Sequence, residues 1–117
     1  MFGIGHGNIT FESHLEKLSE PIKPIMVDLR KFVASLGSNV IEEIRPHRIV
    51  YSKTLNFRIF LDIEPAAATT TTTTNSDSLR LSIRYGKGSP STSLVIMTIE
   101  DVERAKKQIA DAYHRIQ

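Results

Sequence analysis

Two stretches of the chain, residues 56–63 and 78–85, carry apolar side chains at every second position. Successive side chains of a β-strand point to opposite faces of the sheet, so this period predicts two strands with one apolar face. The other parity is mostly polar and basic. We therefore predict an apolar face toward the core and an outward basic face. The outward face is expected to carry Arg58, Phe60 and Asp62 from the first strand, and Arg80, Ser82 and Arg84 from the second.

A different period predicts the main helix. Residues 22–36 repeat apolar side chains at spacings of three and four, which is typical of a helix with one buried face. Pro21 and Pro24 fit its first turn, where backbone N–H groups have no partner within the helix. Gly37 follows at the position of a C-cap glycine.

Two more helices have an N-cap signal. Thr10 precedes a short helix predicted over residues 11–18. Thr98 precedes a final helix that runs to about Ile116, and Asp101 completes a variant of the capping box. Helices are therefore expected on both sides of the strand region.

Shorter strands are predicted at residues 40–44, 48–53 and 94–97. Together with the two alternating stretches they give the order helix, helix, strands, helix. This order predicts the α+β class, with two N-terminal helices and one C-terminal helix packed on one face of a mostly antiparallel sheet of three to five strands.

The chain has 117 residues, which suits a single domain with one core. We predict that residues 10–117 form this domain and that the glycine-rich residues 1–9 are flexible. Residues 65–77 contain six consecutive threonines and have no apolar alternation to bury. We predict a mobile, low-complexity hairpin loop there.

Composition narrows the function. The chain has no cysteine, which excludes disulfides, thiolate zinc sites and cysteine nucleophiles and suits a reducing cytoplasm. No apolar run approaches the ~20 residues that span a bilayer, and no signal pattern opens the sequence. We therefore predict a cytoplasmic protein without membrane contact. The net charge of +2 is too small to indicate nucleic-acid binding by itself.

Four core and strand segments are Ile49–Lys53, Asn56–Phe57, Leu79–Leu81 and Ile109–Tyr113. These segments resemble an uncharacterised bacterial and archaeal domain family that is often labelled "predicted transport protein". That family is also found at the C-terminus of restriction-endonuclease-like proteins. The resemblance implies an accessory module and carries no catalytic residues to transfer.

No catalytic constellation is found in the sequence. A restriction-type nuclease needs a lysine two positions after a strand carboxylate, but Ala66 stands there after Glu64. No two of the four histidines have a short metal-ligand spacing. Neither glycine-rich segment lies between a strand and a helix, as a phosphate-binding loop requires. We predict no enzymatic activity, no metal and no cofactor.

The outward basic face is the best functional candidate. One hypothesis is a non-enzymatic accessory module that uses this face for a protein partner or for a homodimer. The alternative is DNA or RNA binding, with arginines on phosphates and Phe60 stacking on a base. A purely structural explanation is that the arginines pair with acids such as Asp62, Glu42 or Glu43. The predicted binding residues are Arg58, Phe60, Arg80, Arg84, Arg48 and Lys53.

Overall fold

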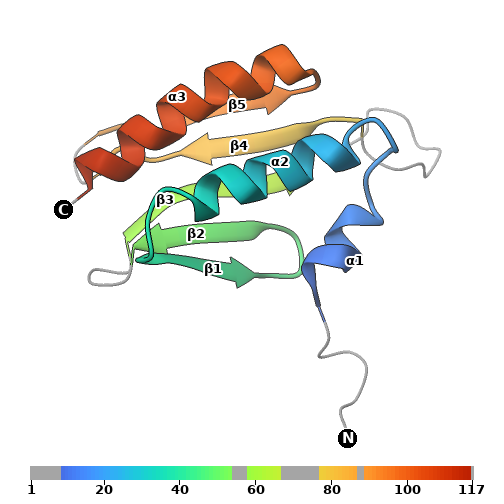
Figure 1. Ribbon diagram of the computed structural model, residues 1–117, viewed down its shortest axis with the longest axis horizontal. Helices are drawn as coiled ribbons and strands as arrows, with labels where there is room; N and C mark the ends of the chain where they lie inside the picture. The colour runs from blue at the N-terminus through green and yellow to red at the C-terminus, as the bar shows by residue number, and fades with distance from the viewer. Residues whose placement is uncertain (1–8, 54–57, 67–76, 87–88, 117) are drawn as a thin grey trace, which may run out of the picture.

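Five antiparallel strands form one sheet in the computed structural model, which describes residues 9–53, 58–66, 77–86 and 89–116 (Figure 1). The strand order follows the chain, so each strand pairs with the next one. The predicted α+β class with an antiparallel sheet is confirmed. The strands are β1 (Val40–Ile44), β2 (Ile49–Lys53), β3 (Arg58–Pro65), β4 (Leu79–Ile83) and β5 (Thr92–Ile96).

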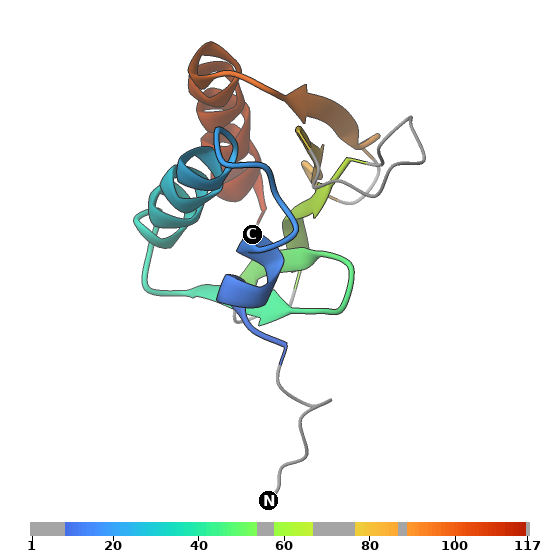
Figure 2. The same ribbon diagram turned by 90° about the vertical axis from the view of Figure 1, so that its right-hand side faces the viewer.

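Three helices accompany the sheet: α1 (Phe11–Leu15), α2 (Lys23–Ala34) and α3 (Ile99–Arg115). Figure 2 shows α2 and α3 on the same side of the sheet. We call the side that they cover the helix face and the opposite side the outer face. Helix α1 lies beside the β1–β2 turn (Figure 1), so the prediction that all three helices pack on one face stays a prediction.

Both predicted N-caps are present. The Thr10 and Thr98 hydroxyls each accept a hydrogen bond from the backbone N–H three residues later, at 3.1 and 3.2 Å. The side chain of that third residue, Ser13 or Asp101, in turn bonds the backbone N–H of the cap. These reciprocal bonds satisfy amide groups that have no acceptor within the helix, and they define where α1 and α3 begin.

The core lies between the helix face and the helices. Strand pairing aligns Tyr51 with Leu61, and Leu61 with Ile83, so these three buried side chains form one row across β2, β3 and β4. A second row is formed by Ile49, Ile63 and Leu81. The helices supply the other half of the core with Leu29 and Val33 from α2 and with Val102, Ala105 and Ile109 from α3.

Phe60 belongs to this core, which corrects its predicted place on the outward face. The pairing of β2 with β3 shifts here: Tyr51 lies opposite Leu61, but Ser52 lies opposite Ile59. Phe60 is therefore the extra residue of a β-bulge. Its side chain is 0% exposed and packs edge-on against Tyr113 of α3, with ring centroids 5.4 Å apart.

The bulge also moves the start of β3 to the other face. Beyond it, Arg58 pairs with Lys53. The Lys53 ammonium lies 4.1 Å from the centroid of the Tyr113 ring and donates a 2.6 Å hydrogen bond to the carbonyl oxygen of Ile116. Paired residues share a sheet face, so Arg58 and Lys53 belong to the helix face. Arg58 was wrongly predicted on the outer face, and Lys53, predicted at a strand end that flanks this face, is not part of it.

The predicted hairpin loop is shorter at its start than expected. Pro65 is the last residue of β3, and the Ala66 amide donates a 3.0 Å bond to the carbonyl oxygen of Ser78. Residues 67–76 lie outside the described residues, as do residues 1–8 of the N-terminal segment that was predicted to be flexible.

Gly37 has a role other than the predicted helix cap. Helix α2 ends at Ala34, and Ser35 is its C-cap. A Cβ atom on Gly37 would lie only 2.2 Å from the hydroxyl oxygen of Tyr113 and 2.9 Å from Oδ1 of Asn39. The Tyr113 hydroxyl donates to that same Asn39 oxygen. Glycine is favoured here because any larger residue would displace the Tyr113 and Asn39 side chains that meet beside it.

The substitution Gly37→Ala should lower the free energy of unfolding by roughly 1–3 kcal/mol, because the added methyl group overpacks this contact. Urea denaturation measures the change. The loss should be smaller in a Tyr113→Phe background, where the nearest atom is gone. Equal losses in the two backgrounds would show that the Tyr113 hydroxyl is not the obstacle.

Phe60→Ala should cost about 3–5 kcal/mol of unfolding free energy, the usual range for removing a buried aromatic ring. Ile9→Ala is the matched control at an exposed apolar residue, where changes stay within about 0.5 kcal/mol. Should both variants unfold at the same denaturant concentration as the parent protein, Phe60 would not be a core residue.

Candidate binding surface on the outer face

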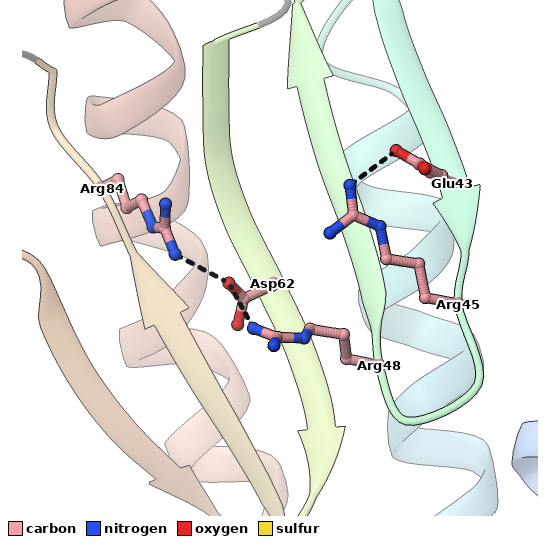
Figure 3. A network of polar contacts seen from close by, with 5 residues as sticks. All are labelled: Glu43, Arg45, Arg48, Asp62 and Arg84. Atoms are coloured by element: carbon pink, nitrogen blue, oxygen red, sulfur yellow. Dashed lines mark hydrogen bonds and ion pairs between the residues drawn. The ribbon is translucent and has the colours of Figure 1, made fainter.

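Asp62 is the centre of the outer face. It lies in the middle of β3, and its carboxylate is reached from both neighbouring strands (Figure 3). Arg84 Nη2 lies 3.4 Å from Asp62 Oδ2, and Arg48 Nη1 lies 3.8 Å from the same oxygen. Asp62 is only 4% exposed, whereas the two arginine side chains are about half exposed. The predicted pairing of Asp62 with an arginine across strands is confirmed.

Strand order explains this convergence. Arg48 immediately precedes β2 and Arg84 immediately follows β4, and both strands are hydrogen-bonded to β3. Adjacent strands lie ≈ 4.7–4.9 Å apart, so a long arginine side chain can reach a carboxylate on the strand between them. One anion therefore holds two cations.

A second ion pair lies toward the β1 edge. Arg45 Nη2 is 3.1 Å from Glu43 Oε1, and both side chains are well exposed (Figure 3). Such exposed pairs contribute little to stability. Arg80 is paired in register with Glu64 on the outer face and is exposed. Four arginines thus line this face, and Glu43, Asp62 and Glu64 are the acids among them.

An apolar residue lies beneath this charged layer. Val50 is paired with Glu43 on one side and with Asp62 on the other, so it points to the outer face, yet it is only 2% exposed. Helices α2 and α3 cover the opposite face, and the outer-face residues Glu43 and Asp62 flank Val50 on the two neighbouring strands. Long arginine side chains can cover apolar surface with their methylene groups while the guanidinium stays in water.

The structure thus divides the predicted binding residues. Arg48, Arg80 and Arg84 lie together on the outer face, whereas Phe60 is in the core and Arg58 and Lys53 belong to the helix face. Sequence alternation misplaced Phe60 and Arg58 because it assumes a strand without a bulge, whereas Lys53 was predicted at a strand end that flanks the face. The run Ile59-Phe60-Leu61 was the available signal, since three consecutive apolar residues break a period of two.

The sequence did not reveal a cluster on the helix face, at the contact between α2 and β1. Arg30 donates two hydrogen bonds of 2.8 and 2.9 Å to the Glu42 carboxylate, and the Tyr51 hydroxyl donates to the same carboxylate at 2.7 Å. The Arg30 guanidinium also lies 4.0 Å from the centroid of the Phe11 ring of α1. Glu42 thus pairs with an arginine of α2 and not with one of the outward-face arginines that the purely structural explanation named.

The charge states in this cluster are well defined. Burial by itself raises the pKa of Glu42, but hydrogen bonds from Arg30 and Tyr51 outweigh it and bring that pKa below its ordinary value. Burial and the bond to Glu42 raise the pKa of the Tyr51 phenol. The carboxylate is therefore ionised and the phenol protonated around neutral pH. Neither group is poised to exchange a proton, so the cluster fits a structural role.

The described part of the chain contains neither a metal-binding group of side chains nor a membrane-spanning helix. It holds no group of three or more histidine, aspartate or glutamate residues placed to bind a metal ion. None of its helices is long and apolar enough to cross a bilayer. His14, one of the histidines considered, is buried, and its Nε2 lies 2.7 Å from the carbonyl oxygen of Arg45.

Comparisons of the chain with protein families, with curated proteins and with solved structures found no match. The resemblance to the "predicted transport protein" family therefore stays a prediction.

Glu42→Gln should flatten the acid side of the stability profile. Because the folded pKa is lowered, the ionised Glu42 stabilises the fold fully above its ordinary pKa of 4.5, and this contribution is lost as the pH falls through the folded value. The unfolding free energy of the parent protein should thus fall more steeply below about pH 4.5.

Chemical denaturation across that pH range measures the difference. Tyr51→Phe removes one donor to the carboxylate and should change the profile in the same direction by less. Parallel profiles for Glu42→Gln and the parent would contradict a lowered pKa.

Proposed function

We propose that this protein is a non-enzymatic binding module whose outer sheet face binds a protein partner through acidic side chains of that partner. The observation that carries the proposal is the pair Arg48 and Arg84, held by the single carboxylate of Asp62. The proposal takes all three helices to lie on the helix face, which leaves the outer face open.

Arg48 and Arg84 have more N–H donors than their contacts with Asp62 use. A guanidinium carries five N–H donors in a planar fork that matches a carboxylate. Arg48 and Arg84 approach the same oxygen of Asp62, and half of each side chain is exposed to solvent. Asp62 restrains both guanidinium groups, which lowers the entropy lost when a partner's carboxylate binds them.

Arg45 and Arg80 extend the same charge along the face. Arg45 lies toward β1, and Arg80 lies at the beginning of β4. An extended acidic segment that crosses the strands could contact several of these side chains in turn. This arrangement supports an acidic chain segment as the ligand better than a single small anion.

DNA or RNA is the second candidate, since the same guanidinium groups can contact phosphates. The burial of Phe60 removes the aromatic group that was expected to stack on a base. The surface still offers guanidinium groups to an anion, but it no longer offers Phe60 as a ring on which a base could stack. A protein partner is therefore the better supported ligand. We further propose a cytoplasmic location, which the absence of cysteine supports.

Fluorescence anisotropy with a labelled aspartate- and glutamate-rich peptide tests the proposal, with a labelled single-stranded DNA oligomer of equal charge in parallel. The peptide should bind more tightly than the DNA, and added salt should weaken its binding. Arg80→Gln and Arg84→Gln should each weaken peptide binding by about tenfold, because each removes a charge-assisted hydrogen bond.

Lys31→Gln removes one exposed positive charge from α2, away from the outer face, and serves as the matched control. It should leave the affinity for the peptide nearly unchanged. Tighter binding of the DNA would favour the nucleic-acid alternative. If Lys31→Gln and Arg84→Gln weakened peptide binding equally, the effect would come from the net charge of the protein alone. That result would reject this face as the binding site.

A further inference from the structure

Strand β5 leaves an unprotected sheet edge. It pairs with β4 on one side, and no described strand lies on its other side. Its sequence, Thr-Ser-Leu-Val-Ile, contains no charge and no proline. Natural proteins usually protect such an edge with lysine, proline, a bulge or a covering element, because its free N–H and C=O groups pair readily with another strand.

Exposed apolar side chains gather at the same edge. Val95, Met97 and Ile99 are 53%, 58% and 54% exposed, and only one other large apolar side chain in the described part of the chain, Ile9, is exposed. The opposite edge differs, since β1 carries an exposed Glu43 and is followed by Pro46. The exposed apolar side chains therefore gather at the edge where β5 has no further partner strand among the described residues.

Helix α3 borders this edge with a polar stripe. A groove lies between the strand residues Leu94, Val95 and Ile96 and the helix residues Asp101, Arg104 and Gln108. The helical spacing of three and four continues the stripe beyond Gln108. In order along α3, the stripe consists of Asp101, Arg104, Gln108, Asp111 and Arg115.

Read from either end, the stripe presents charges of opposite sign at matching positions, so two antiparallel copies attract each other. If two copies of α3 lie antiparallel about an axis at Gln108, Asp101 faces Arg115 of the second copy, and Arg104 faces Asp111. Every charge then meets its opposite, and the two glutamines meet each other. A symmetric dimer requires such a self-complementary surface.

One two-fold axis can relate both the strands and the helices of two copies, because the middle of β5 and the middle of the stripe lie beside the same groove. Leu94, in the middle of β5, lines the groove together with Gln108, in the middle of the stripe. An axis beside Leu94 would pair the β5 strands of two copies in the antiparallel direction. The same axis would bring the two α3 stripes to face each other.

We propose that this protein forms a two-fold symmetric homodimer through β5, with the two α3 stripes alongside. The two five-stranded sheets join into one antiparallel sheet, and Val95, which is paired with Arg80 on the outer face, then lies next to Ser93 of the second copy. The two outer faces then lie on the same side of the joined sheet. The occupant of the β5 edge is a second copy of this chain, and its interface is distinct from the Arg48–Asp62–Arg84 surface.

Sedimentation equilibrium tests the dimer with matched charge variants. The parent protein should show twice its monomer mass of 13.1 kDa. Arg104→Glu and Asp111→Lys each create two pairs of like charges in the dimer, so each should raise the dissociation constant at least roughly tenfold. Mixing the two variants should restore dimerisation, since each altered residue then faces an opposite charge in the other copy.

Lys107→Glu is the control, because it reverses an exposed charge of α3 outside the stripe. It should leave the dissociation constant close to that of the parent. Val95→Lys should favour the monomer by placing a charge on the sheet edge. A parent protein that stays monomeric at all concentrations would overturn the proposal, as would two charge variants whose mixture dimerises no better than either alone.

Discussion

The β-bulge at Phe60 is the constraint on which the rest of the fold depends. One extra residue in β3 turns Phe60 toward α3, where it meets Tyr113, and it leaves Leu61 and Ile63 in register with the core rows of β2 and β4. Without the bulge, either Phe60 or Leu61 would have to face water. The local cost of one irregular pairing is offset by the burial of a whole aromatic ring.

Two buried or half-buried carboxylates organise the polar contacts, one on each face of the sheet. Glu42 on the helix face is bound by Arg30 and Tyr51, so its hydrogen-bonding capacity is used inside the fold. Asp62 on the outer face lies between Arg48 and Arg84, whose guanidinium groups keep half their surface in water. The first arrangement holds a helix against a strand, whereas the second presents cations to solvent.

Much of the fold could be predicted from sequence because its signals are local. The caps at Thr10 and Thr98 and the apolar stripe of α2 depend on neighbouring residues alone, and all were found. The run Ile59-Phe60-Leu61 signals an irregular strand, but that Phe60 turns toward the helix face depends on Tyr113, which is distant in the chain. Of the arginines predicted on the outer face, Arg80 and Arg84 lie there because β4 alternates regularly. Arg58 lies beyond the bulge and therefore belongs to the helix face.

The contact of Tyr113 with Asn39 has a consequence for how the chain folds. These two residues are 74 positions apart, whereas each strand pairs with the strand that precedes or follows it in the chain. Hairpins can thus form early, but the groove for Tyr113 between Gly37 and Phe60 stays open until α3 has been synthesised. During translation the part of the helix face that α3 covers therefore stays exposed after the strands have been made, until residues 99–115 have followed them.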